Sequence, residues 1–109
     1  MRELPIWILE HLHETLNIEM LAARVAMSPR HFSRIFAHEF GMTPAHFVER
    51  LRVDTAKRFL AESDKSLEEI AQRVGFGSMD TMDRSFRRQV GELLSRFRRS
   101  ERTAQREDA

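Results

Sequence analysis

Several residue types are rare or missing in this chain of 109 residues. Cysteine and tyrosine are absent, and there are 3 prolines, 4 glycines and 1 tryptophan. The lack of cysteine excludes disulfides and thiolate metal sites. Apolar runs are only a few residues long, which excludes a membrane-spanning helix, and the start lacks the basic segment and apolar stretch of a signal peptide. We therefore expect a cytoplasmic protein that makes no contact with a membrane.

The motifs of catalytic and metal sites are missing as well. The histidines form no H-E-x-x-H motif and no His/Cys cluster, and there is no glycine-rich phosphate loop. His31 and His38 are spaced to share a helix face, where histidines are more often neighbours of solvent or phosphate than metal ligands. We expect no enzyme activity, no metal and no cofactor.

One pattern occurs twice along the chain. Residues 18–25 (I-E-M-L-A-A-R-V) overlay residues 67–74 (L-E-E-I-A-Q-R-V), and the match continues over 28–41 and 78–91. One insertion, where A-M-S becomes G-F-G-S, falls in the turn, where no helix register is disturbed. Each copy is typical of two short helices joined by a tight turn. This is the outline of a helix-turn-helix, whose second helix commonly lies in a DNA major groove.

Capping signals set the helix ends. Asn17, Ser28, Thr43, Ser66 and Ser78 stand where helices should begin, and three glycines follow apolar residues where helices should end: Gly41, Gly75 and Gly91. We predict helices near 4–14, 18–26, 29–40, 44–62, 67–74 and 79–90, with a shorter one near 94–101. No segment alternates with period two, so we predict an all-α fold of about seven helices, with one small core per copy.

The second helix of each copy has one apolar and one polar face. Apolar side chains recur with helical spacing at Phe32, Ile35, Phe36 and Phe40, and again at Met82, Phe86 and Val90. The opposite faces carry Arg30, Ser33, Arg34 and Ala37 in the first copy and Asp80, Thr81, Arg84 and Arg88 in the second. One such helix could simply have a solvated polar face, but two copies with arginine at the same place favour two exposed recognition helices.

Positive charge is concentrated near the end of the chain, although the net charge is only +1. Between residues 84 and 106 only Glu92 and Glu101 oppose the arginines at positions 84, 87, 88, 96, 98, 99, 102 and 106. Such a segment supplies the phosphate-neutralising charge that dominates nucleic-acid affinity. For Arg102 and Arg106 a solvated basic tail is an equal alternative.

These motifs carry a family resemblance. Residues 66–88, S-L-E-E-I-A-Q-R-V-G-F-G-S-M-D-T-M-D-R-S-F-R-R, resemble the second-unit signature of the AraC/XylS-type DNA-binding domain, and residues 28–36, 41–47 and 52–60 support the match. The resemblance implies two helix-turn-helix subdomains (1–42 and 64–101) joined by a linker helix (43–63), followed by a polar tail (102–109) that we expect to be disordered. The first unit is most similar to regulators with an amidotransferase-like effector domain.

The resemblance also implies a function and its residues. It implies sequence-specific binding of double-stranded DNA for transcriptional regulation, with the two recognition helices in successive major-groove segments. The base-reading residues would be Arg30, Ser33, Arg34, Asp80, Thr81 and Arg84, with Asp80 either accepting from cytosine or holding Arg84 in place. Phosphates would be bound by Ser28, Thr43, Ser78, Arg87, Arg88, Arg96 and Arg98.

The exposed helix faces also suit an alternative function. This is a helical protein-interaction module that binds RNA polymerase or a regulatory domain outside this chain. We expect the chain itself to be a monomer.

The start of the last helix departs from the family pattern. Leu93 and Leu94 stand where the first copy has Thr43 and Pro44, so the last helix lacks a hydroxyl cap and a proline at its start. The two leucines could pack inward or form a small apolar surface.

Overall fold

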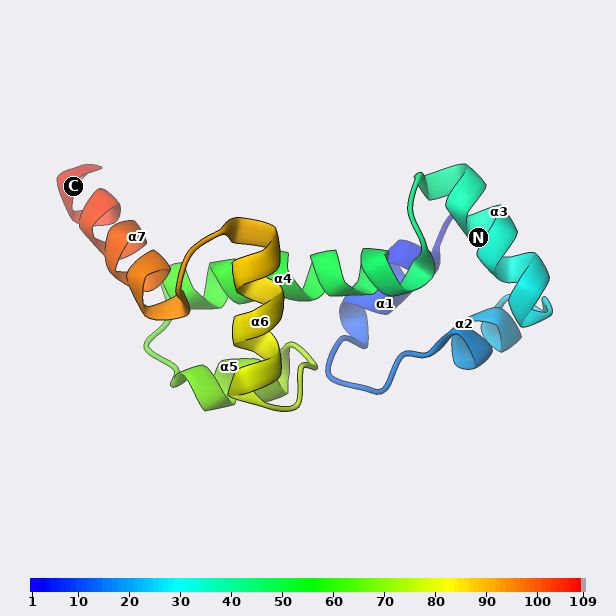
Figure 1. Ribbon diagram of the computed structural model, residues 1–109, viewed down its shortest axis with the longest axis horizontal. Coiled ribbons are helices and arrows are strands. Elements are labelled where there is room, and N and C mark those ends of the chain that lie inside the picture. The colour runs from blue at the N-terminus through cyan, green and yellow to red at the C-terminus, as the bar shows by residue number, and fades with distance from the viewer. Residues whose placement is uncertain (109) are drawn as a thin grey trace. The chain divides into compact units, whose positions relative to one another are not determined.

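The computed structural model describes residues 1–108, with side chains described up to residue 104, and every regular element in that range is a helix (Figure 1). The elements are α1 (Leu4–Glu10), α2 (Ile18–Arg24), α3 (Pro29–Phe40), α4 (Pro44–Glu62), α5 (Leu67–Arg73), α6 (Met79–Val90) and α7 (Leu94–Asp108). The predicted all-α fold with about seven helices is therefore confirmed.

Short polar side chains fix where the helices begin. The side chains of Asn17, Ser28, Ser66 and Ser78 each accept a hydrogen bond from the backbone amide three residues further on, at 2.8–3.2 Å. Each bond satisfies one of the amides that the first turn of a helix leaves without an intrahelical acceptor. Gly41 and Gly91 end α3 and α6 in the left-handed conformation, with φ of 73° and 83°. The capping residues inferred from the sequence are thus confirmed at these positions.

The chain forms two compact units, and the division falls inside α4, between Leu51 and Arg52. α4 coincides with the linker helix expected at 43–63, while the predicted subdomain limits around it stay predictions. Each unit has its own core, as expected from the repeat. In the first unit the buried residues are Leu4, Ile8, Leu12, Leu21, Ala22, Phe32, Phe36 and Val48. In the second they are Val53, Ala56, Leu60, Ile70, Ala71, Val74, Met82, Phe86 and Leu94.

Repeated positions have repeated environments in the two cores. Ala22 and Ala71 are both completely buried, as are Phe36 and Phe86 on the second helix of each unit. Phe36 contacts Phe47 edge-on with ring centroids 5.3 Å apart, and Phe86 contacts Phe97 in the same way at 5.2 Å. These aromatic contacts join α3 to α4 and α6 to α7.

The turns of the two units differ in one informative way. Both contain a backbone bond of 2.9 Å to the carbonyl of the buried alanine, from Met27 to Ala22 and from Phe76 to Ala71. The second turn uses Gly75 and the inserted Gly77, which have φ of 91° and 81°. The first turn places Ala26 at φ 57°, and it is the one non-glycine residue with positive φ among the described residues. An alanine in this left-handed conformation costs free energy that a glycine does not.

Two helix ends differ from those expected. α1 stops at Glu10 instead of continuing to residue 14, because the chain turns at His11, whose Nδ1 lies 2.7 Å from the Trp7 carbonyl oxygen and whose amide bonds Ile8. α7 continues to Asp108, whereas we expected it to end near 101 and to be followed by a disordered tail. Residues 102–108 contain neither glycine nor proline and include good helix formers, so nothing in them stops the helix. Residue 109 lies outside the described residues.

Two arginines attach α7 to the end of α4. Arg98 donates from Nε to the Leu60 carbonyl at 3.1 Å and from Nη2 to the carbonyls of Ser63 at 2.9 Å and Phe59 at 3.5 Å. Arg102 also donates to the Ser63 carbonyl, and its Nη2 lies 2.8 Å from an Asp64 carboxylate oxygen. Carbonyls at a helix C-terminus lack intrahelical donors and carry partial negative charge, so guanidinium groups suit them. We call these four bonded groups, Arg98, Arg102, Ser63 and Asp64, the arginine clamp.

The start of α7 shows how the chain manages without a hydroxyl cap. Leu94 is buried in the second core, whereas Leu93 keeps 41% of its surface exposed. The Leu93 carbonyl accepts from Phe97 at 2.9 Å, as the Thr43 carbonyl accepts from Phe47 at 3.0 Å. The backbone of the helix start is therefore preserved, and the leucines divide between the two alternatives stated above, one packing inward and the other lying at the surface.

We expect Ala26→Gly to stabilise the first unit by about 0.5–1 kcal/mol. The left-handed conformation costs a non-glycine residue about 1–2 kcal/mol, and the greater freedom of glycine in the unfolded chain offsets about 0.4–1 kcal/mol of the gain. Urea denaturation would measure the change. Ala37→Gly, at an exposed position within α3, should lower stability by about 1 kcal/mol. A destabilised Ala26→Gly protein would contradict the assignment of strain to this turn.

We expect Arg98→Met to lower stability by about 1–3 kcal/mol, because it leaves carbonyls at the end of α4 without their charged donor. The value should lie toward the low end, since Arg98 is only half-buried. Arg99→Met removes the same charge from an exposed position of the same helix and should change stability by less than about 0.5 kcal/mol. Equal losses in the two variants, measured by thermal unfolding, would rule out a structural role for Arg98.

Candidate nucleic-acid interface

The exposed side of α3 carries the residues predicted to read bases in the first unit. Arg30 and Arg34 are exposed and Ser33 is half-buried, while Phe32 and Phe36 on the opposite side are completely buried. Nη2 of Arg34 lies 3.4 Å from Nδ1 of His31 on the preceding turn. The structure thus brings the three predicted residues onto one helix, on the side away from the core.

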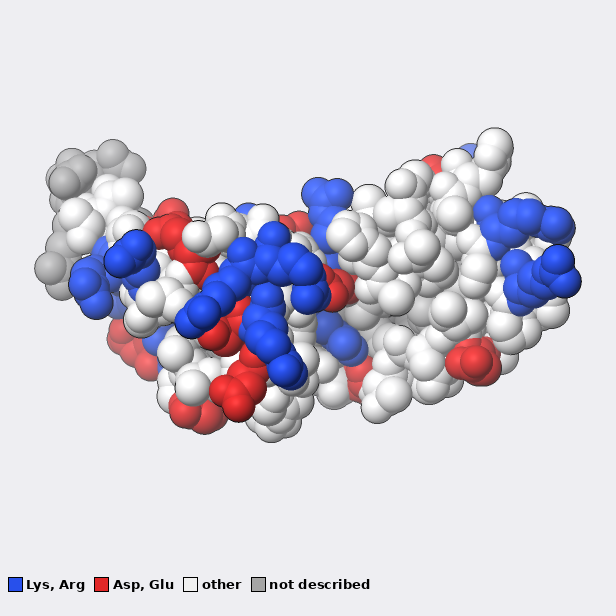
Figure 2. Space-filling view, viewed as in Figure 1, with Lys and Arg blue, Asp and Glu red and all other residues white. Residues whose placement is uncertain are grey.

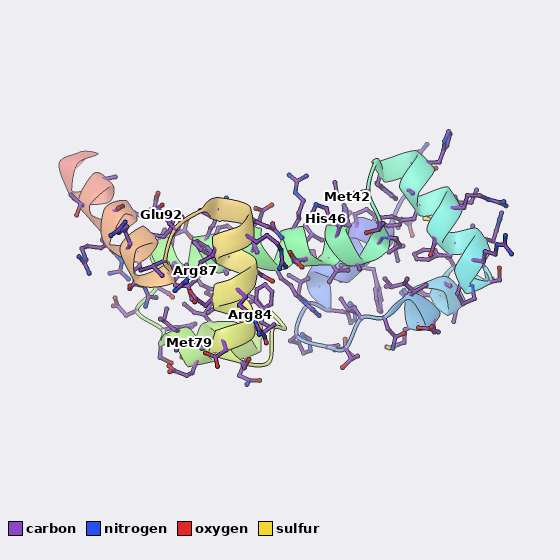
Figure 3. All side chains as sticks on the ribbon, in the orientation of Figure 1. Met42, His46, Met79, Arg84, Arg87 and Glu92 are labelled. Atoms are coloured by element: carbon purple, nitrogen blue, oxygen red, sulfur yellow. The ribbon has the colours of Figure 1, made fainter. Side chains whose placement is uncertain are left out.

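The exposed side of α6 has a similar arrangement in the second unit. Asp80 and Arg84 are exposed and Thr81 is half-buried, whereas Met82 and Phe86 are completely buried. Figure 3 labels Arg84 and Arg87 on this helix. The predicted division of each recognition helix into an apolar and a polar face is therefore confirmed.

The ion pair on α6 is not the one considered above between Asp80 and Arg84. Arg87 Nε lies 3.2 Å from Asp83 Oδ2, one helical turn earlier, and Arg88 Nη2 lies 3.4 Å from the hydroxyl of the buried Ser85. Among the described residues, Arg84 forms no ion pair with Asp80. Its guanidinium is therefore available to a ligand without first breaking an ion pair.

The serine and threonine hydroxyls at the helix starts form hydrogen bonds within the chain. Ser28 and Thr43 accept from the amides of His31 and His46, each at 3.2 Å, and their hydroxyl protons can still be donated. Ser78 donates its proton to Thr81 Oγ1 at 3.0 Å. Because Thr81 accepts that bond, its own hydroxyl proton is available to an acceptor such as a base edge or a phosphate.

The arginines predicted to bind phosphate divide into two groups. Arg87, Arg88 and Arg96 are exposed. Arg98 is held in the arginine clamp, where burial lowers its pKa, the charge of Arg102 lowers it further and Asp64 raises it. The guanidinium stays protonated at neutral pH and bonds the backbone of its own chain. The structure therefore gives Arg98 a structural role, and the phosphate contact expected from the sequence stays a prediction.

The arginines at the matching positions 24 and 73 have different partners. The Arg24 guanidinium lies 4.3 Å from the ring centroid of Trp7, a cation–π contact, and the Trp7 ring in turn stacks on His11 at 4.1 Å. Arg73 pairs with Glu69 at 3.3 Å. The partners differ because Met20 stands where the second copy has Glu69, so the first copy lacks a carboxylate one turn before its arginine.

Two exposed side chains near the predicted residues were given no individual role in the sequence analysis. Met79 is the first residue of α6 and is 36% exposed, beside Asp80. Arg99 is exposed on α7 three residues after Arg96. Their signals were present in the sequence, since Met79 directly follows the capping Ser78 and Arg99 has helical spacing from Arg96.

Basic side chains gather over α3 in the first unit and over α6 in the second (Figure 2). Among the described residues, no group of His, Asp or Glu has the arrangement of a metal site. In the same part of the chain, no helix combines the length and apolar character needed to cross a bilayer. α3 and α6 thus each present an exposed polar face from a unit with its own core.

Comparisons with known proteins agree with this arrangement. A family model described as a helix-turn-helix domain matches residues 21–100. An HTH-type transcriptional regulator of Mycobacterium tuberculosis is 48% identical over 84 residues, covering 77% of this chain and 32% of the relative. The HTH-type transcriptional activator RhaS of Salmonella schwarzengrund is 35% identical over 89 residues, covering 82% of this chain and 32% of the relative. The chain thus spans about a third of the length of these relatives.

Solved structures resemble the chain over nearly its whole length. The DNA-binding domain of the global transcriptional factor AdpA, solved in complex with a target DNA, is 41% identical with a TM-score of 0.91, and the match covers 94% of this chain and 93% of that one. An AraC-type DNA-binding domain protein from Chromobacterium violaceum shares the fold at 23% identity, with a TM-score of 0.83 over 92% of this chain and 89% of that one. Together with the matched family model, these likenesses establish that the chain belongs to the AraC-type helix-turn-helix domains of transcriptional regulators.

Proposed function

We propose that this chain binds double-stranded DNA sequence-specifically to regulate transcription, with α3 and α6 as its two recognition helices. The observation that carries the proposal is that both helices bury an aromatic face and expose an arginine at the same repeated position, Arg34 and Arg84. The likeness to the AdpA domain, which was solved with its target DNA, supports it. Family membership, and not the lack of a catalytic cluster, favours a binding domain over an enzyme.

Base reading is assigned to exposed or half-buried side chains near the starts and middles of α3 and α6. Arginine can bond guanine O6 and N7 together, threonine offers a hydroxyl and a methyl group, and aspartate can accept from cytosine N4. The proposed residues are Arg30, Ser33, Arg34, Asp80, Thr81 and Arg84. For Asp80 the absence of an ion pair with Arg84 in the described structure favours direct contact with the base over a role in holding the arginine.

Phosphate binding is assigned to the helix starts and the remaining exposed arginines. Ser28, Thr43 and Ser78 stand at the positive ends of α3, α4 and α6, where backbone amides favour anions. Arg87, Arg88 and Arg96 add charge that is not specific to sequence. Ser78 acts through its backbone and through the hydroxyl of Thr81, because its own proton is engaged.

The proposal also covers the cellular location of the protein and its protein partners. We place the protein in the cytoplasm, where a regulator of this family meets DNA. RNA polymerase and an effector domain outside this chain are the proposed protein partners. The effector domain would be of the amidotransferase-like type carried by the regulators that the first unit resembles. Salt-tolerant binding to such proteins, without salt-sensitive binding to DNA, would instead favour the protein-interaction module.

Substitutions should separate the two kinds of DNA contact. Arg34→Ala or Arg84→Ala should weaken binding to a site selected from a random duplex pool by about 1–3 kcal/mol and relax the preference at one position each. Arg87→Ala or Arg88→Ala should weaken binding to all sequences and reduce the slope of log K against log salt by about one unit. Fluorescence anisotropy over a range of salt would measure both. Equal weakening of selected and random DNA by Arg84→Ala would move that residue to the phosphate class.

The arrangement of the bound site gives a second test. Two unlike recognition helices in one chain predict a monomer that reads two different half-sites in successive major-groove segments, about 34 Å apart. A duplex with only one half of the selected site should therefore bind much more weakly. Sedimentation of the chain with its duplex should show one chain per site. Undiminished affinity for a single half, or two chains on a palindrome, would contradict this arrangement.

A further inference from the structure

We propose that the outer face of α7 binds the phosphate backbone of the duplex beyond the base pairs that α6 contacts, through Arg96 and Arg99. The inference rests on the proposed DNA binding and adds a third contact surface to the two recognition helices. It assigns a phosphate contact to Arg99, and it places the contacts of both arginines beyond the base pairs that α6 contacts.

The rotation of α7 about its own axis is fixed by the residues on its inner face. Leu94 is buried in the second core, and the Phe97 ring packs edge-on against Phe86 of α6 at 5.2 Å. Further along the same face, Arg98 and Arg102 form the arginine clamp with the end of α4. A helix held at both of these levels cannot turn its other side inward.

The residues left on the outer face form a continuous polar stripe. Its exposed members are Ser95, Arg96, Arg99, Ser100 and Thr103. Among the described residues, neither Arg96 nor Arg99 pairs with a carboxylate, so both charges are available. Three residues of helix separate them by about 4.5 Å along the axis of α7. Their long side chains allow the two guanidinium groups to reach different phosphates of one strand.

The basic side chains of α7 appear on the same side of the second unit as those of α6 (Figure 2). α6 and α7 are joined by the short segment that contains Glu92, and they contact each other through Phe86 and Phe97 (Figure 3). A duplex that meets the exposed side of α6 therefore continues past α7. An acidic protein surface would also suit two arginines, but the shared side with the recognition helix favours the duplex.

The test compares two duplexes and the double variant Arg96→Gln/Arg99→Gln in the full chain. One duplex ends at the last base pair whose identity selection fixes on the α6 side. The other continues for about one helical turn, about 10 base pairs, of random sequence. The wild-type protein should bind the longer duplex about tenfold more tightly at 0.1 M salt, and the double variant should bind both equally. On the longer duplex the variant should reduce the salt slope by about two units, since each phosphate contact contributes about 0.9.

The control Lys57→Gln/Arg73→Gln makes the same change in net charge within the second unit, at residues of α4 and α5 that pair with Asp54 and Glu69 and take no part in the arginine clamp. It should keep the full preference for the longer duplex. An equal loss of preference in the control would reduce the effect to net charge and overturn the proposal, as would an undiminished preference in the Arg96→Gln/Arg99→Gln protein. Failure of the wild-type protein to bind even the shorter duplex would instead overturn the proposed function, because that duplex lacks the phosphates assigned to α7.

Discussion

Burial of one face of α3 and of α6 is the constraint on which the proposed interface depends. Helices of seven residues, such as α2 and α5, are too short to be stable alone, so they persist only by packing their apolar residues against these longer helices. Phe36 and Phe86 are completely buried on these longer helices, and each also contacts a phenylalanine ring of the following helix. The polar side of each recognition helix is therefore set by what the opposite side buries.

Much of the helix arrangement could be predicted from the sequence, because helix ends depend on residues that are close together in the chain. The starts and ends of α3, α4 and α6 match the expected residues. Each is set by a residue that affects only its sequence neighbours: a serine or threonine cap at the start, a proline in the first turn of α3 and α4, and a left-handed glycine after α3 and α6. α7 is longer than the helix expected near 94–101, because the polar residues that follow include none that stops a helix. Its attachment depends on Arg98 meeting a carbonyl 38 positions earlier, and spacing along the chain carries no sign of such a contact.

Three arginines of this small domain have three different environments, which shows why residue counts alone do not define an interface. Arg24 stacks on an aromatic ring, Arg98 bonds the end of a helix, and Arg84 stands exposed on α6. The planar guanidinium suits all three because it is weakly hydrated and presents several donors in fixed directions. Exposure distinguishes an arginine that can meet DNA, and Arg87 remains exposed although it pairs with Asp83. Such information comes from packing and not from sequence position.

The two cores occupy consecutive stretches of the chain, and this affects how the protein forms during synthesis. Every buried residue of the first core lies between Leu4 and Val48, whereas the second begins at Val53 and is complete only when Leu94 is present. The first unit can therefore fold on the ribosome while the second is still being translated, in keeping with the general tendency of domains to fold in order from the N-terminus. α6 becomes fully supported last, after α7 has emerged. A chain terminated before that point would have one fully packed recognition helix, α3, while α6 would lack its final packing partner, α7.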